Sequence, residues 1–100
     1  CEDLYVVADQ LGNWYVEIYN MYKRFEFGNI DDVMKKRNKI QSTINNLMDL
    51  QIEDIRTTEN SPRNTRLYFS ILLETNEMVS STFKLLRLHK EFLEFKQANK

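Results

Sequence analysis

The chain has 100 residues, 42% of them hydrophobic, which is enough to bury one small core but not two independent ones. Its 14 Lys and Arg residues nearly balance its 15 Asp and Glu residues, so the net charge of −1 gives no general attraction to nucleic acid or to an anionic membrane. Two glycines and one proline leave few places for sharp turns, which disfavours a many-stranded β fold and favours long helices.

The segment from Leu4 to Phe25 predicts a first helix, because its apolar residues alternate spacings of three and four and so share one helical face. These residues are Leu4, Val7, Leu11, Trp14, Ile18, Met21 and Phe25. Gly28 can adopt the left-handed backbone that ends a helix, and Asn29 can cap the next helix, with Asp31 and Asp32 in its first turn. We therefore expect a tight connection at Gly28 and Asn29.

A second helix is expected from Ile30 to about Arg56, with Arg37 interrupting its apolar face. That face comprises Ile30, Val33, Ile40, Ile44, Leu47 and Met48, then Gln51 or Ile52, and Ile55. A polar segment follows, and Pro62 suits a first helical position with Asn60 or Ser61 as the cap. The third helix is therefore expected to begin at Pro62.

The third helix carries two adjacent apolar rows. One row is Leu67, Ile71, Met78, Leu85 and Phe92, and the other is Leu72, Val79, Phe83, Leu86 and Leu93. A face this wide implies two neighbouring helices, so we expect the third helix to pack against both others. The prediction is a single all-α domain over residues 1–100, an elongated antiparallel three-helix bundle. Helices of about 24, 27 and 35 residues would span roughly 35 to 50 Å.

The sequence offers no catalytic constellation and no metal or cofactor site, so we expect a protein that is not an enzyme. His89 is the only histidine, and it has no carboxylate three or four residues away. Its neighbours at those spacings are Leu85, Leu86, Phe92 and Leu93. This pattern predicts a core or boundary histidine rather than a ligand.

Carboxylates occur in pairs that have ordinary explanations on a helix. The pairs are Asp31 with Asp32, Glu53 with Asp54, and Glu74 with Glu77. The first suits a helix N-terminus and the second an exposed face, whereas Glu74 lies between the apolar rows of the third helix. The basic run at 35–39 could face phosphate or lipid, but a solvated helical face explains it more simply.

Three tyrosines form a second row on the first helix, beside its apolar face. They are Tyr15, Tyr19 and Tyr22. Tyrosine buries apolar area and keeps a polar tip, so this row either completes the three-helix core or forms a protein interface. These three residues are the candidate partner interface.

No apolar run approaches the roughly 20 residues needed to cross a bilayer, so we expect no direct membrane insertion by this segment. The single cysteine, Cys1, has no partner for a disulfide. Because the chain begins at Cys1 rather than Met, we expect it to be excised from a larger protein.

The polar corner and the segment Ser61–Thr75 (Ser-Pro-Arg-Asn-Thr-Arg-Leu-Tyr-Phe-Ser-Ile-Leu-Leu-Glu-Thr) give the chain a family resemblance. It resembles the PhoU-like domains, in which such a corner leads into a helix with a small-x-x-Tyr-hydrophobic-x-Ile-Leu pattern. Residues 65–72 match that pattern. The resemblance implies a PhoU-like or spectrin-like up-down-up bundle. The carboxylates of the family's metal motif fall on Asn76 and Ser80, so the resemblance carries over no metal ligand.

PhoU-like modules stand alone in bacterial phosphate regulation or form the cytoplasmic tail of sodium/phosphate and inorganic phosphate transporters. The resemblance therefore implies a non-catalytic regulatory or interaction domain of a phosphate transporter, on the cytoplasmic side of the inner membrane. Its partner would be the transmembrane part of its own transporter or another copy of itself. One alternative is an oligomerisation or scaffold bundle unrelated to phosphate, and another is a metal-binding PhoU-type regulator.

Overall fold

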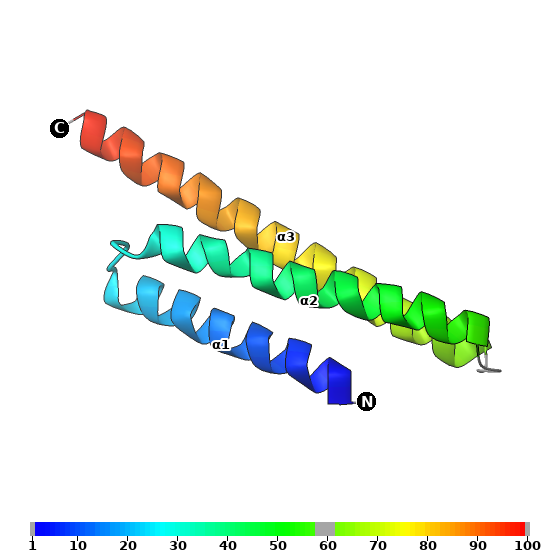
Figure 1. The fold of residues 1–100 in the computed structure, drawn as a ribbon. Helices are drawn as coiled ribbons and strands as arrows, with labels where there is room; N and C mark the ends of the chain where they lie inside the picture. Colours follow the sequence, from blue (N-terminus) through cyan, green and yellow to red (C-terminus); the bar gives the residue numbers. More distant parts are fainter. Residues whose placement is uncertain (1, 58–61, 100) are drawn as a thin grey trace.

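The computed structural model describes residues 2–57 and 62–99, and it confirms the all-α, antiparallel three-helix bundle (Figure 1). The helices are α1 (Glu2–Arg24), α2 (Ile30–Thr57) and α3 (Pro62–Ala98). The bundle is elongated, with extents of 62 × 20 × 17 Å. α3 begins at Pro62 as predicted, while Cys1 and the predicted caps at Asn60 and Ser61 lie outside the described residues.

α2 is the central helix, with α1 on one side and α3 on the other (Figure 1). Cα atoms of α2 approach within 8 Å of both other helices, whereas over the described ranges no Cα atom of α1 lies within 8 Å of one in α3. α3 does contact both other helices, as the sequence predicts. It reaches α1, however, only through side chains.

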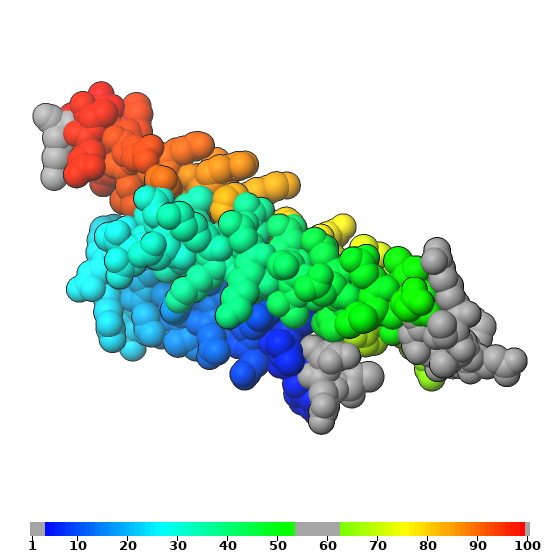
Figure 2. Space-filling view, in the orientation of Figure 1, coloured from blue at the N-terminus to red at the C-terminus, as the bar shows by residue number. Residues whose placement is uncertain are grey.

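α3 is the longest helix, and both of its ends extend past α1. The contacts of Tyr15 with Thr82 and of Tyr22 with His89 each join residues 67 positions apart, so α1 lies parallel to α3 and begins about two turns after α3 does. Asp31, at the start of α2, pairs with Lys90. Residues 92–98 therefore project beyond the α1–α2 connection, as the orange and red end of α3 shows in Figures 1 and 2.

The core is a strip of apolar side chains contributed by all three helices. The buried members are Val7, Trp14, Met21, Ile30, Val33, Ile40, Ile44, Leu47, Leu72, Val79 and Leu86, with Leu4, Leu11, Ile18 and Met48 half-buried against them. The faces predicted for the first two helices are confirmed at these positions. The indole Nε1 of Trp14, which is 2% exposed, donates a hydrogen bond of 2.7 Å to the Val33 carbonyl and so fixes α1 against α2.

The two apolar rows predicted on α3 have different fates. Leu72, Val79 and Leu86 are fully buried against the other helices. The row of Leu67, Ile71, Met78, Leu85 and Phe92 is exposed instead. The other helices therefore cover only one of the two apolar rows of α3, and the second row faces solvent.

The α1–α2 connection differs from the prediction. Phe25, rather than Gly28, has the left-handed backbone, with φ of 53°, and neither Gly12 nor Gly28 has a positive φ. The amide of Glu26 bonds to the Met21 carbonyl and that of Phe25 to the Tyr22 carbonyl, which is the Schellman pattern that ends a helix. Phe25 is thus outside the helix and 74% exposed, and its predicted place in the core is wrong.

We predict that the free energy of unfolding is about 1 kcal/mol higher for Phe25→Gly than for Phe25→Ala. The reason is that only glycine adopts a positive φ without a steric penalty. Both variants lose the ring, so the difference isolates the backbone. Urea denaturation of each variant measures it. At Asp9, an exposed position inside α1, the order should reverse, with Ala more stable than Gly by roughly 1 kcal/mol. Equal or greater stability of Phe25→Ala would contradict the prediction.

Candidate interaction surface

Two tyrosines of α1 bridge the space to α3. The hydroxyl of Tyr15 lies 2.9 Å from Oγ1 of Thr82, and the hydroxyl of Tyr22 lies 2.9 Å from Nδ1 of His89. Both tyrosines are half-buried, and burial raises the pKa of Tyr22 above its ordinary value. A tyrosine can span this space because its ring buries apolar area while its hydroxyl bonds at the far side.

His89 lies at one end of this bridge, within an aromatic cluster. The centre of its ring lies 5.0 Å from that of Tyr22, 4.5 Å from that of Phe27 and 6.5 Å from that of Phe92. It is half-buried, which is the boundary position that the sequence predicts. Within residues 2–57 and 62–99, no group of three or more His, Cys, Asp or Glu side chains is placed to hold a metal ion.

α3 presents a long apolar row to solvent, which we call the α3 seam. Its members are Leu67, Ile71, Met78, Leu85, Leu88, Phe92 and Phe95, which are 45% to 66% exposed. Successive members are three, four or seven residues apart, so they share one face over most of the helix. Met78 and Leu85 stand four residues before Thr82 and His89. The α3 seam therefore adjoins the side chains that face α1.

The opposite flank of α3 faces α2 and is occupied by contacts. They are a hydrogen bond from Gln41 Nε2 to Asn76 Oδ1 (3.2 Å), the Arg37 guanidinium 3.8 Å from the Phe83 ring centre, and an ion pair of Lys90 with Asp31 (2.6 Å). The hydrogen bond and the charge of Asp31 raise the pKa of Lys90. The α3 seam thus lies away from α2, on the side of the bundle where the backbones of α1 and α3 stay apart.

α1 contributes a second exposed row on the same side, which we call the α1 row. Its members are Tyr5, Ala8, Gly12 and Tyr19. They share a helical face with Tyr15 and Tyr22, which bond to α3. A Cβ added at Gly12 would meet no atom within 4 Å, so the space above the middle of α1 is open.

The three candidate interface tyrosines are therefore divided between two places. Tyr15 and Tyr22 contact α3, whereas Tyr19 is 62% exposed on the α1 row. Leu88 and Phe95 are not in either row predicted from the sequence, although each stands three residues after a member of the exposed row. Counting three residues onward from Leu85 and from Phe92, in addition to the spacing of seven, identifies both residues.

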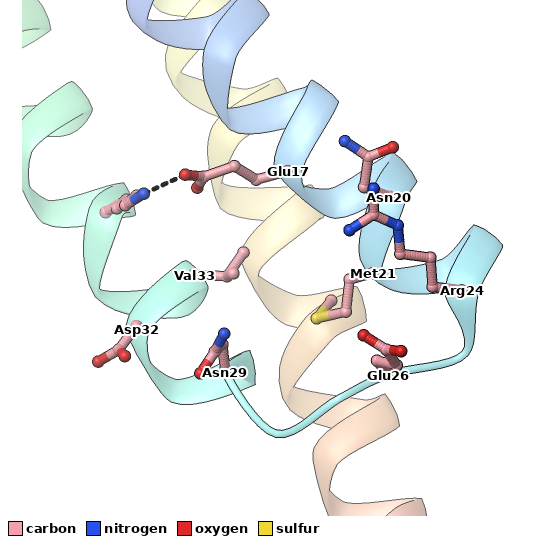
Figure 3. Close-up of a pocket in the computed structure, with 9 residues that line it drawn as sticks. Glu17, Asn20, Met21, Arg24, Glu26, Asn29, Asp32 and Val33 are labelled. Carbon is pink, nitrogen blue, oxygen red and sulfur yellow. Dashed lines mark hydrogen bonds and ion pairs between the residues drawn. The ribbon is translucent and has the colours of Figure 1, made fainter.

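A polar depression of about 390 Å³ lies between the end of α1 and the start of α2 (Figure 3). Its lining residues are Glu17, Asn20, Met21, Arg24, Glu26, Asn29, Asp32, Val33 and Lys36. Glu17 is ion-paired with Lys36, and Glu26 and Asp32 lie on opposite sides of the view in Figure 3. Acids and bases are interspersed here, so the depression gathers no single charge for a metal ion or a phosphate.

The other charged groups singled out in the sequence also stay dispersed. In the basic run 35–39, Lys36 reaches Glu17 on α1 while Arg37 lies over Phe83 on α3. Glu74 and Glu77 are both exposed on α3. Asn76, where the resemblance places a metal-motif carboxylate, is a half-buried amide bonded to Gln41.

No family model, curated protein or solved structure matches this chain. None of the helices, over the residues described, is long and apolar enough to cross a membrane. The feature that distinguishes the molecule is the apolar surface formed by the α3 seam and the α1 row.

We predict that Tyr22→Phe lowers the free energy of unfolding by about 1 kcal/mol at neutral pH, because it removes the bond to His89 and leaves the ring in place. Tyr19→Phe, at an exposed position, should change it little. The pKa of Tyr22 is higher in the folded state than in the unfolded state. Its protonated side chain therefore contributes fully to stability at a pH below the pKa of the unfolded state, and the contribution is lost as the pH rises through the pKa of the folded state. Urea denaturation should therefore show the difference shrinking above pH ~10. Equal effects of Tyr22→Phe and Tyr19→Phe at neutral pH would contradict the bridge, and a difference that stays constant with pH would contradict the raised pKa.

Proposed function

We propose that this domain is a non-catalytic helical interaction module that binds a helix of another polypeptide along the α3 seam and the α1 row. The observation that supports it is the α3 seam, with seven large apolar side chains each about half exposed. Single exposed apolar residues are ordinary on a protein surface. A row about 42 Å long, the rise of 28 helical residues, with polar residues only at Glu74 and Ser81, is typical of an interaction site.

The arrangement of the helices supports a helical partner rather than an extended one. α2 lies between α1 and α3, so the chain fills three of the four positions of a four-helix bundle, and the apolar surface lies at the fourth. A helix in that position would cover both exposed rows at once. The absence of a side chain at Gly12 leaves room for its close approach.

A phosphate transporter is the narrower setting that we propose for this module. Its support is the resemblance of residues 61–75 to PhoU-like domains, in which such bundles form cytoplasmic tails. In that setting the module would act by contact with the transmembrane part or with another copy, and would bias the transport cycle.

We expect deletion of this domain from the intact protein to alter phosphate uptake or its regulation, with the rest of the protein still produced. Uptake of labelled phosphate in cells measures this. The substitution Leu85→Glu, on the exposed seam, should reproduce the effect without unfolding the domain. Unchanged uptake and regulation after deletion would reject the phosphate setting and leave the interaction module itself standing.

Site-directed photo-crosslinking tests the interaction module. We expect a benzophenone amino acid in place of Leu85, in the intact protein in cells, to give a discrete product whose partner mass spectrometry identifies. The same residue in place of Arg87, which is exposed outside the α3 seam, should not give it. Leu88→Glu should abolish the product. No product at position 85, or equal yields at both positions, would reject the module.

A further inference from the structure

We propose that the helix bound on this surface is α3 of a second copy of the chain, lying antiparallel to the first. The inference rests on the proposed function and names its partner. In a two-fold arrangement the same patch is used on both copies, so each α3 occupies the open position beside α1 and α3 of the other. One contact then covers both α3 seams.

The exposed area is sufficient for such a dimer. Seven side chains of 45% to 66% exposure offer on the order of 700 Å², and the α1 row adds to this. A stable complex buries about 800 Å² on each partner. The seam thus supplies most of what one half of a dimer interface needs.

The proposed antiparallel register is the one that overlaps the two α3 helices most completely. The α3 seam combines two sets of positions spaced by seven residues: 71, 78, 85 and 92, and 67, 74, 81, 88 and 95. When two such helices pair antiparallel, each residue of one set lies opposite a residue of the other set. The most complete overlap sets Leu67 against the partner's Phe92 and Ile71 against the partner's Leu88. Met78 then faces the partner's Ser81. The small serine side chain lies near the centre of the interface, where the helices approach most closely.

The charges beside the α3 seam favour this same register. Glu77, Lys84 and Glu91 are exposed at spacings of seven along one flank. In the register above, Glu77 lies beside the partner's Lys84. By two-fold symmetry, Lys84 also lies beside the partner's Glu77. Sliding one helix by seven residues in one direction would place Lys84 of each copy beside Lys84 of the other. Sliding it by seven residues in the opposite direction would do the same with Glu77, so like charges would meet in either case. Charge thus excludes slides of seven residues. A slide of fourteen would pair Lys84 with the partner's Glu91 but would leave Leu67 and Ile71 uncovered.

A parallel pairing is disfavoured by Glu74. This residue is exposed and lies in line with the α3 seam, not between the two apolar rows as the sequence predicts. Parallel helices in register would bring two Glu74 carboxylates together, and like charges at such positions are destabilising. The antiparallel register separates them and sets each opposite the partner's Leu85.

The unequal helix lengths also fit an antiparallel partner. The first turns of α3, around Leu67, have no part of α1 beside them, and Leu67 is 47% exposed. The last turns, with Phe92 and Phe95, project past α1 and α2. Antiparallel pairing places the projecting end of each copy over the uncovered end of the other.

Disulfide trapping tests the orientation, with Cys1→Ser in every chain so that one thiol remains. We expect an oxidised mixture of Leu67→Cys and Phe92→Cys chains to give a linked dimer containing one of each. Neither chain alone should link to itself, since two residues at position 67 would lie about 38 Å apart along the axis. Self-linking of Leu67→Cys would show a parallel pair and overturn the proposal.

Charge reversal tests the register by analytical ultracentrifugation. Lys84→Glu should raise the dissociation constant of the dimer roughly tenfold or more, because two attractive pairs become repulsive. Adding Glu77→Lys should restore it to within about threefold. Arg87→Glu, the same charge change outside the flank, is the matched control and should have little effect.

A chain that remains monomeric at about 100 μM, well above the micromolar range of weak dimers, would overturn the proposal. So would a dimer in which the double charge reversal fails to restore what Lys84→Glu weakens. If the photo-crosslink at position 85 then identifies a different protein, the interaction module stands and the second copy is rejected. If no crosslink forms at all, both fail.

Discussion

The distance between α1 and α3 is the constraint on which the shape of this molecule depends, and Tyr15 and Tyr22 maintain it. Each ring fills the space between the two helices, and each hydroxyl bonds to a side chain of α3. Smaller side chains at these positions would leave the space between the two helices unfilled, or would let α1 move closer to α3. The tyrosines thus link α1 to α3 while the backbones of the two helices stay apart.

α1 keeps this distance from α3 because it is packed against α2. Trp14 donates to the Val33 carbonyl from within the core, so α1 cannot roll toward α3 without leaving a buried indole unpaired. The α2–α3 pair is fixed by Leu72, Val79 and Leu86, which are fully buried, and the ion pair of Lys90 with Asp31 lies at the periphery. Apolar burial and a few oriented bonds hold the three helices, and surface charge contributes little.

The sequence predicts most of the fold because spacing alone reports which residues share a helical face. It identifies α1, α2 and the start of α3 at Pro62, together with nearly all of the core. It misses the role of Phe25, because glycine is preferred at a left-handed position and the apolar spacing extends one residue beyond the helix. Nor does spacing reveal which apolar row of α3 is buried, since both rows are apolar and the positions of α1 and α2 decide.

Two polar residues within the α3 seam limit how tightly it can bind a partner helix. Glu74 and Ser81 stand where a strong coiled coil would carry large apolar residues, so four layers of the proposed two-fold interface, two from each copy, lose apolar contact. Such interruptions lower affinity, while the flanking Glu77 and Lys84 restrict the alignments that remain. A dimer built in this way would be weaker than one with an unbroken apolar seam, yet selective in orientation. That combination suits a module whose association is meant to change, and a permanently assembled scaffold would gain from a continuous apolar seam.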